Sequence, residues 1–447
     1  MDQLKKLFES FLADGAAMAR EIIELRRHLH QHPEIGHQEL VTTGLLRTEM
    51  EKLNLTIYDK DLVTGFWADL DTGRPGPTIA VRSDIDALQV EEKTNLPFAS
   101  KETGKMHACG HDVHMAIMIG AARLLAKHRD QLKGRIRFIA QPAEEVPPGG
   151  AEILIKAGVL KSPQVDAIVA LHVDPSLPTG SLGMRDGINM AATYDFDMTV
   201  IGQSGHAAKP HEAVDAITVA AQIITGLQQV ITRMVDPVNP ALLTFGTIAG
   251  GTARNVVADK VLLRGTLRTL DAKLVRQLPR QIKKTAIDIA RAFGANVKII
   301  PVGDFPGLEA DPKVNEIIFQ AYKDLFPTGK TYRIPVILGG EDFSRYLQTT
   351  PGSMFRLGVG NKKIGADKPW HHSQFIVDED AIPIGFITMA ATVVRMLNAY
   401  KTKDKVESKD GKPGGRPSRR KPTGRPRRSR PHRSRPRPQP KKSDSNQ

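Results

Sequence analysis

The sequence has 447 residues, with 63 Lys and Arg against 49 Asp and Glu, which gives a formal net charge of +14. The excess lies entirely in residues 401–447, which hold 18 basic and four acidic side chains and leave residues 1–400 with 45 charges of each sign. A neutral body with a basic tail excludes a globally basic nucleic-acid-binding fold. The length is sufficient for one large domain or for two to three smaller ones.

The single cysteine, Cys109, excludes an intrachain disulfide and favours a reducing compartment. The N-terminal segment carries three acidic side chains and lacks the apolar core of a secretory signal. The longest weakly polar stretch, residues 381–394, contains Pro383 and Gly385 and is shorter than the ~20 residues that a membrane span needs. We therefore expect a cytoplasmic protein without a membrane span.

The first half of the chain predicts an α/β fold. Apolar residues at helical spacing predict a helix over residues 1–30. Four strands are then expected, with helices over 112–129 and 150–160 between them; their sequences are FWADL, TIAVRSD, RIRFIAQ and AIVALHV. Strands that alternate with helices predict a mostly parallel central sheet, whose functional residues lie at the carboxyl ends of its strands.

Residues 190–304 show a different order of expected elements, β-α-β-β-α-β, which is the ferredoxin-like split unit. This order predicts a domain inserted into a first domain formed by residues 1–189 and 305–400. The chain then returns to a helix at 312–325, a strand IPVIL, a strand MFRLGV and a closing helix at 379–399.

From Lys401 onward the only apolar residue is Val406, and eight of the 30 prolines lie there. Such a segment cannot bury enough surface to offset the entropy of ordering it, so residues 401–447 are expected to be disordered.

Several loops carry side chains that can bind metal ions. Cys109 and His111 flank a glycine before a predicted helix, and the adjacent carboxylates Glu144 and Glu145 follow a strand, as does His172. Thiolate and imidazole suit Zn²⁺, whereas imidazole and carboxylate also suit Mn²⁺, Co²⁺ or Ni²⁺. The alternative for Cys109 alone is a buried structural cysteine. The alternative for Glu144 and Glu145 alone is a solvated acidic turn. With a histidine from the Trp-His-His run at 370–372, the set is about large enough for two metal ions.

Nine motifs, in this order, resemble the amidohydrolase branch of the M20 metallopeptidase family, which includes hippurate hydrolases, auxin-conjugate hydrolases and bacterial N-acyl-amino-acid amidohydrolases. They are RRHLHQHPEIGHQE, RSDIDAL, MHACGHDVH, QPAEE with GGA, LH, GHAAKP, NVV with GTLR, GGEDF and HHSQF. The resemblance covers about residues 20–400. It departs at Gln89, Ser204 and Trp370, where the family usually has Pro, Gly and Leu.

The resemblance implies a dinuclear divalent-metal site with five ligands. These are Cys109, His111, Glu145, His172 and His371. It further implies that Glu144 is the general base, which takes a proton from the attacking water and returns it to the leaving nitrogen. Asp86 would orient a ligand from behind, with Asp84 as a companion.

The resemblance also assigns roles to the inserted domain, as a lid and a dimerisation domain. His206 would reach the site of a neighbouring subunit and stabilise the oxyanion, while Asn255 and Arg268 would bind the free carboxylate of the substrate. Gly339 and Gly340 would let the backbone approach the substrate. These roles imply a homodimer or a higher homo-oligomer.

The leading hypothesis is therefore a metal-dependent amidohydrolase of N-acyl amino acids, such as hippurate-like or N-acetyl compounds. A carboxypeptidase or dipeptidase of the same family is the near alternative. A different class of function is polyanion binding through the basic tail, which would depend on salt. No aromatic residue lies in that tail, so base stacking is not expected.

Overall fold

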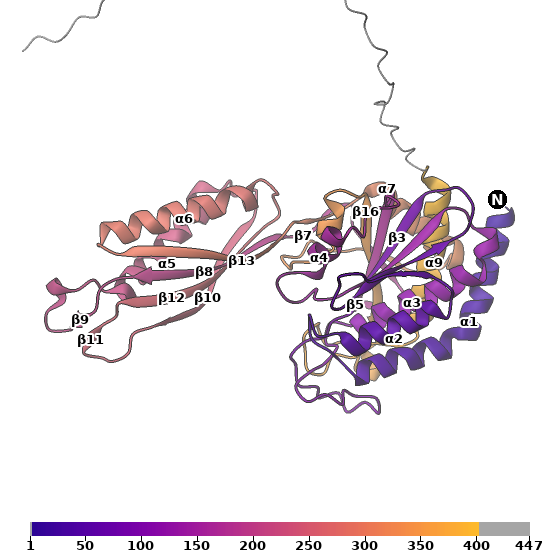
Figure 1. Cartoon of the computed structure of the whole chain (residues 1–447), viewed down its shortest axis with the longest axis horizontal. Coiled ribbons are helices and arrows are strands. Elements are labelled where there is room, and N and C mark those ends of the chain that lie inside the picture. Colours follow the sequence, from indigo (N-terminus) through magenta and orange to yellow (C-terminus); the bar gives the residue numbers. More distant parts are fainter. Residues whose placement is uncertain (1, 402–447) are drawn as a thin grey trace, which may run out of the picture. The chain divides into compact units, whose positions relative to one another are not determined.

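The computed structural model describes residues 2–401, so nearly all of the predicted disordered tail lies outside the described residues. The α-helices of the described chain are α1 (Asp2–Gln31), α2 (Leu40–Glu51), α3 (His111–Lys127), α4 (Gly150–Ala157), α5 (Ala216–Met234), α6 (Leu274–Ala292), α7 (Pro312–Leu325), α8 (Ser344–Leu347) and α9 (Ala381–Ala399). Figure 1 shows them around two separate sheets.

The main sheet has eight strands in the order β1-β2-β4-β3-β5-β16-β6-β15. Their bounds are β1 (Thr56–Tyr58), β2 (Phe66–Asp71), β3 (Thr78–Asp84), β4 (Arg135–Gln141), β5 (Ala167–Pro178), β6 (Leu182–Met184), β15 (Thr331–Arg333) and β16 (Gly352–Gly360). The four central strands β4, β3, β5 and β16 run parallel, and β2 is antiparallel to β4. The predicted α/β class with a mostly parallel sheet is confirmed.

Helices cover both faces of the main sheet. Successive side chains along each strand point to opposite faces and therefore pack into two different cores. In β3, Ile79 and Val81 pack into the larger core with α1, α3, α7 and α9. Ala80, between them, packs into a second core with α4 and α8. Burial on both faces explains why the central strands read as continuous apolar runs and not as alternating ones.

Helix α9 corrects one reading of the sequence. The expectation from residues 381–394 was a stretch too short for a membrane span, but the helix is 19 residues long and is apolar enough to cross a membrane by length and composition. Pro383 lies in its first turn, where the missing N–H has no helical acceptor to lose, so it does not interrupt the helix. The helix packs against α1, α3 and α7, and 78% of its most apolar window is buried inside the protein, as expected of a core helix.

A second, four-stranded sheet has the order β10-β12-β8-β13, and all its pairs are antiparallel. The strands are β8 (Ala192–Ile201), β10 (Ala241–Gly250), β12 (Lys260–Thr269) and β13 (Asn296–Phe305). Helices α5 and α6 cover one face, where α6 buries Leu278, Ile282 and Ala286 at intervals of four residues. The chain order is β-α-β-β-α-β; its role as a lid or dimerisation domain stays a prediction.

The chain passes between the two sheets through two short strands, β7 (Gly187–Met190) and β14 (Leu308–Ala310), which pair antiparallel to each other. The strand predicted at residues 334–338 is not formed. β15 ends at Arg333, and only Ile337 makes an isolated bridge, to Met190. Pro335 has no N–H to donate, which prevents a continuous ladder at this point.

Candidate active site

The candidate site lies where parallel strands of the main sheet end. Asp84 is the last residue of β3, Glu144 and Glu145 follow β4, and His172 belongs to β5. A cavity of about 360 Å³ opens there. Eight of the twelve predicted site residues line it: Cys109, Glu144, Glu145, His172, Arg268, Gly339, Gly340 and His371.

Gly110 shapes the turn that places the two ligand candidates of helix α3. It has a φ of 89° and caps the N-terminus of α3, so Cys109 precedes the helix and His111 begins it. A Cβ at this position would collide with a methyl group of Val173. The turn therefore requires glycine both for its left-handed backbone and for its close approach to β5.

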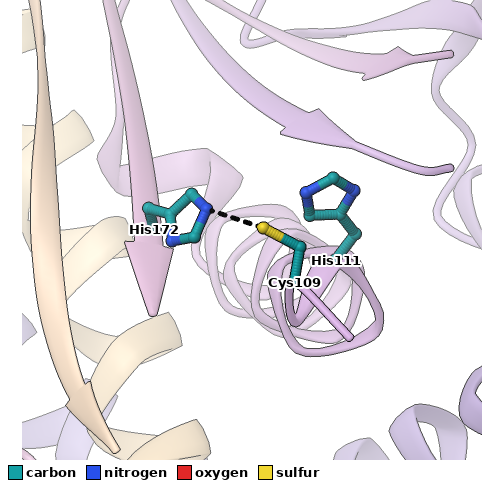
Figure 2. Close-up of side chains that lie close together, drawn as sticks. All are labelled: Cys109, His111 and His172. Atoms are coloured by element: carbon teal, nitrogen blue, oxygen red, sulfur yellow. Dashed lines mark hydrogen bonds between the residues drawn. The ribbon is translucent and has the colours of Figure 1, made fainter. Parts of the chain in front are cut away.

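Cys109 is common to two groups of candidate ligands. Its Sγ lies 3.4 Å from Nε2 of His172, and Figure 2 shows both side chains beside His111. The ligand atoms of Cys109, His111 and His172 lie within 4.8 Å of one another, and so do those of Cys109, Glu145 and His371. A sulfur shared by two such groups can bridge two metal ions.

The orientation of the histidines also fits metal ions. Nδ1 of His111 lies 2.8 Å from the carbonyl oxygen of Asp86, and Nδ1 of His172 lies 2.8 Å from that of Val173. When Nδ1–H donates to a carbonyl, Nε2 is left with a lone pair for a metal. Nε2 of His111 is buried and has no hydrogen-bond partner among the described residues, which is costly unless it binds an ion.

Asp86 and Asp84 form hydrogen bonds with residues that are ligand candidates or their neighbours. Besides the contact of its carbonyl with His111, Asp86 accepts a hydrogen bond from the backbone N–H of Glu145 at 3.0 Å. Asp84 lies 2.6 Å from Nδ1 of His114, whose Nε2 accepts from the N–H of Val173. Asp86 therefore holds the loop of Glu145, and Asp84 links helix α3, which begins with His111, to strand β5, which carries His172.

Glu144 is buried among other carboxylates. Burial, together with the charges of Glu341, Glu145 and Asp342, raises the pKa of Glu144 well above its usual range. Hydrogen bonding with Cys109 and Glu145 raises the pKa of His371 to about 10. So many acidic groups in one cavity are costly to bury without cations, and divalent metal ions would supply the missing positive charge.

Arg82 contacts several of the acidic groups around the site. Its guanidinium is fully buried and donates to Gln141, Asp84, Glu341 and Asp342, at distances between 2.7 and 3.1 Å. Arg82, Glu341 and Asp342 lie in the motifs RSDIDAL and GGEDF but were not among the predicted site residues. For Arg82 the available signal was a charged residue inside an otherwise apolar strand, β3.

Four predicted site residues do not line the cavity: Asp86 and His111 lie behind its wall, in contact with each other, whereas His206 and Asn255 lie elsewhere. His206 and Asn255 are exposed and lie beside each other, since the short strands β9 (Gly205–His206) and β11 (Val256–Val257) pair and Ala207 N–H donates to the Asn255 carbonyl. Arg268 does reach the cavity, where its Nη1 donates to the Leu338 carbonyl at 2.7 Å. The chain by itself brings together the metal candidates, Glu144 and Arg268, without His206 and Asn255.

Residues 80–395 match the family model of peptidase family M20/M25/M40. The chain belongs to this family. The match confirms the resemblance inferred from the nine motifs, and with it a metal-dependent hydrolase of amide bonds. The ligand groups described above fit the two divalent metal ions of an M20 enzyme.

Individual M20 relatives are similar over most of the chain. An N-acetylcysteine deacetylase of Bacillus subtilis is 38% identical over 392 residues, which cover 87% of this chain and 100% of the relative. Thermostable carboxypeptidase 1 of Saccharolobus solfataricus is 36% identical over 395 residues, which cover 88% and 99%. The crystal structure of a dinuclear metal-binding M20 peptidase from Bacillus subtilis has a TM-score of 0.74 and 35% identity, with 86% and 99% covered.

Proposed function

We propose that this enzyme hydrolyses the amide bond of N-acyl amino acids and that Glu144 is its general base. The observation that carries the proposal is the buried Glu144 carboxylate in the same cavity as the shared Cys109 sulfur. The N-acetylcysteine deacetylase relative supports the substrate class.

Two divalent ions held by Cys109, His111, Glu145, His172 and His371 would polarise the amide carbonyl and lower the pKa of the attacking water. Glu144 accepts the proton that the water loses and donates it to the leaving nitrogen. Which of Mn²⁺, Zn²⁺, Co²⁺ or Ni²⁺ is native is part of the test below.

Arg268 is proposed to bind the free carboxylate of the amino acid, because its guanidinium can form a bidentate pair at the cavity wall. Gly339 and Gly340 are proposed to bring the backbone close to the substrate. A Cβ on Gly340 would lie only 2.9 Å from the Phe305 ring, so a side chain there would push this wall inward or displace it.

His206 and Asn255 are proposed to act on the site of a second copy of the chain. They are exposed and do not line the cavity that holds Glu144, which supports a contribution between subunits of a homodimer. In that arrangement His206 donates a hydrogen bond to the developing oxyanion, and Asn255 joins Arg268 at the substrate carboxylate. A cytoplasmic location remains our proposal from the single cysteine.

The decisive experiment compares the wild type with Glu144→Gln after chelation and reconstitution with each of the four metals. Substrates are N-acetyl, N-benzoyl and N-indoleacetyl amino acids. We expect Glu144→Gln to keep two metal ions per chain and to lose about 10²–10⁴-fold in kcat, the usual contribution of a general base. Retained turnover in this variant would reject Glu144 as the base.

A carboxypeptidase is the second candidate, because two relatives from Saccharolobus solfataricus carry that name at 36% identity. The two activities differ in what fills the acyl pocket. Adding N-blocked dipeptides to the same panel separates them: an amidohydrolase cleaves the simple N-acyl amino acids with the higher kcat/KM, and a carboxypeptidase cleaves the blocked dipeptides with the higher kcat/KM.

A further inference from the structure

Arg356 is a buried cation in the wall of the active-site cavity. It lies on β16, where its Cα pairs with that of His172 on the neighbouring strand β5. The residue is only 5% exposed, and it lines the same cavity as Glu144 and Arg268.

Arg356 differs from the other buried arginines of the described chain, which are Arg26, Arg82 and Arg137. Each of those three has a carboxylate oxygen within 2.9 Å, at Asp112, Asp84 and Asp69 respectively. Arg356 forms no ion pair with any described residue. Its side-chain hydrogen bond is a weak one, from Nη2 to the Met190 sulfur at 3.4 Å.

The indole ring of Trp370 packs against the guanidinium of Arg356. The Cζ of Arg356 lies 5.2 Å from the centre of the Trp370 ring, which itself packs edge-on against His172 at 5.2 Å. The indole N–H donates to the carbonyl oxygen of Val173 at 2.9 Å and so fixes the ring. Trp370 is also a position where the sequence departs from the family pattern.

A buried guanidinium without a carboxylate partner is costly, and it is expected where a ligand supplies the anion. Burial lowers the pKa of Arg356. The negative charges of Asp174 and of the acidic groups of the cavity offset this effect only in part. Because Arg268 is already assigned to the α-carboxylate, the second cation in the same cavity calls for a second anion. The simplest alternative is that Arg356 only balances the acidic groups of the site.

We propose that Arg356, held against Trp370, binds a second carboxylate of the substrate, and that the enzyme therefore prefers N-acyl amino acids with two carboxylates. This inference rests on the proposed function and specifies its substrate class. The second carboxylate can come from a dicarboxylic acyl group or from an acidic amino acid, and in both cases a guanidinium fork binds it in the same way.

The test measures kcat/KM for substrate pairs that differ in one carboxylate. N-succinyl-L-alanine is compared with its neutral isostere N-(4-methylpentanoyl)-L-alanine, and N-acetyl-L-glutamate with N-acetyl-L-glutamine. The wild type is expected to prefer the charged member of one pair by about 100-fold, as for a buried charge pair. The pair that shows the preference identifies the source of the second carboxylate.

Arg356→Met is expected to remove this preference, by lowering kcat/KM about 100-fold more for the charged member of the pair than for its isostere. Arg356→Lys should retain part of it, since the charge stays but the fork is lost. Arg264→Met is the control, because Arg264 is an exposed arginine on β12 of the second sheet. No preference in the wild type, or an equal loss for charged and neutral substrates in Arg356→Met, would overturn the proposal.

Calorimetry separates this inference from the proposed function. In the Glu144→Gln background, the charged member of the preferred pair should bind at least about tenfold more tightly than its isostere, and Arg356→Met should abolish the difference. If the wild type cleaves no N-acyl amino acid but this binding difference is found, the proposed reaction fails while the carboxylate subsite stands. If Arg356→Met does not fold, Arg356→Lys and Trp370→Leu provide the same comparison.

Discussion

Gly110 offers a sharp test of how the backbone positions Cys109 and His111. Gly110→Ala places a Cβ at a φ of 89° and against a methyl group of Val173, which lies on a buried strand and cannot easily move. The left-handed backbone costs roughly 1–2 kcal/mol for a residue other than glycine. The collision adds about 1–3 kcal/mol, as is typical of overpacking. The free energy of unfolding should therefore fall by about 2–5 kcal/mol.

The assay is urea unfolding at equilibrium, together with the number of metal ions bound per chain. Gly158→Ala is the control, because Gly158 also caps a helix with a positive φ, of 98°, here at the C-terminus of α4, but its Cβ would meet nothing within 4 Å. It should lose only the backbone part. Val173→Ala, combined with Gly110→Ala in a double-mutant cycle, should recover about 1–3 kcal/mol of the loss. If Gly110→Ala and Gly158→Ala cost the same and Val173→Ala gives no relief, the collision is not significant.

Three further predictions concern the metals, the pH and the tail. Cys109→Ser should leave the fold intact but lower metal affinity by at least about tenfold, measured by titration with a competing chelator, because a hydroxyl is a poorer metal ligand than a thiolate. Burial raises the pKa of Glu49, but hydrogen bonds from Lys52 and Arg123 outweigh it, so the net pKa is lowered. The ionised Glu49 therefore stabilises the fold above the unfolded pKa near 4.5, and this contribution is lost as the pH falls through the lower folded pKa. The free energies of unfolding in urea of the wild type and Glu49→Gln should differ at pH 7 and converge in acid. Deletion of residues 405–447 should leave kcat/KM for amide hydrolysis nearly unchanged, and a large drop would show that the tail takes part in the reaction.

The sequence was sufficient to predict the loops that carry the metal candidates, because period and composition mark where buried strands end. Glu144, Glu145 and His172 directly follow or end apolar runs, and parallel strands bring such ends together. The position of Arg356 could not be predicted in this way. Its strand reads as an ordinary apolar run with one charge, and the burial of that charge depends on Met190 and Trp370, which come from distant parts of the chain.

Helix α9 could be predicted as a helix, since residues 379–399 were expected to form one and the structure has it from Ala381 to Ala399. Its burial could not be predicted from local sequence, because it depends on packing against α1, α3 and α7. Similarly, His206 and Asn255 were recognised by motif, yet only the folded chain reveals that they do not line its own cavity.

Arg82 brings one positive charge to three carboxyl groups, those of Asp84, Glu341 and Asp342. These contacts tie the loop that contains Glu341 and Asp342 to strand β3 through a cation that is part of the chain. Because one guanidinium cannot balance three carboxylates, the buried cluster favours positive charge in the neighbouring cavity through groups that need not be metal ligands themselves.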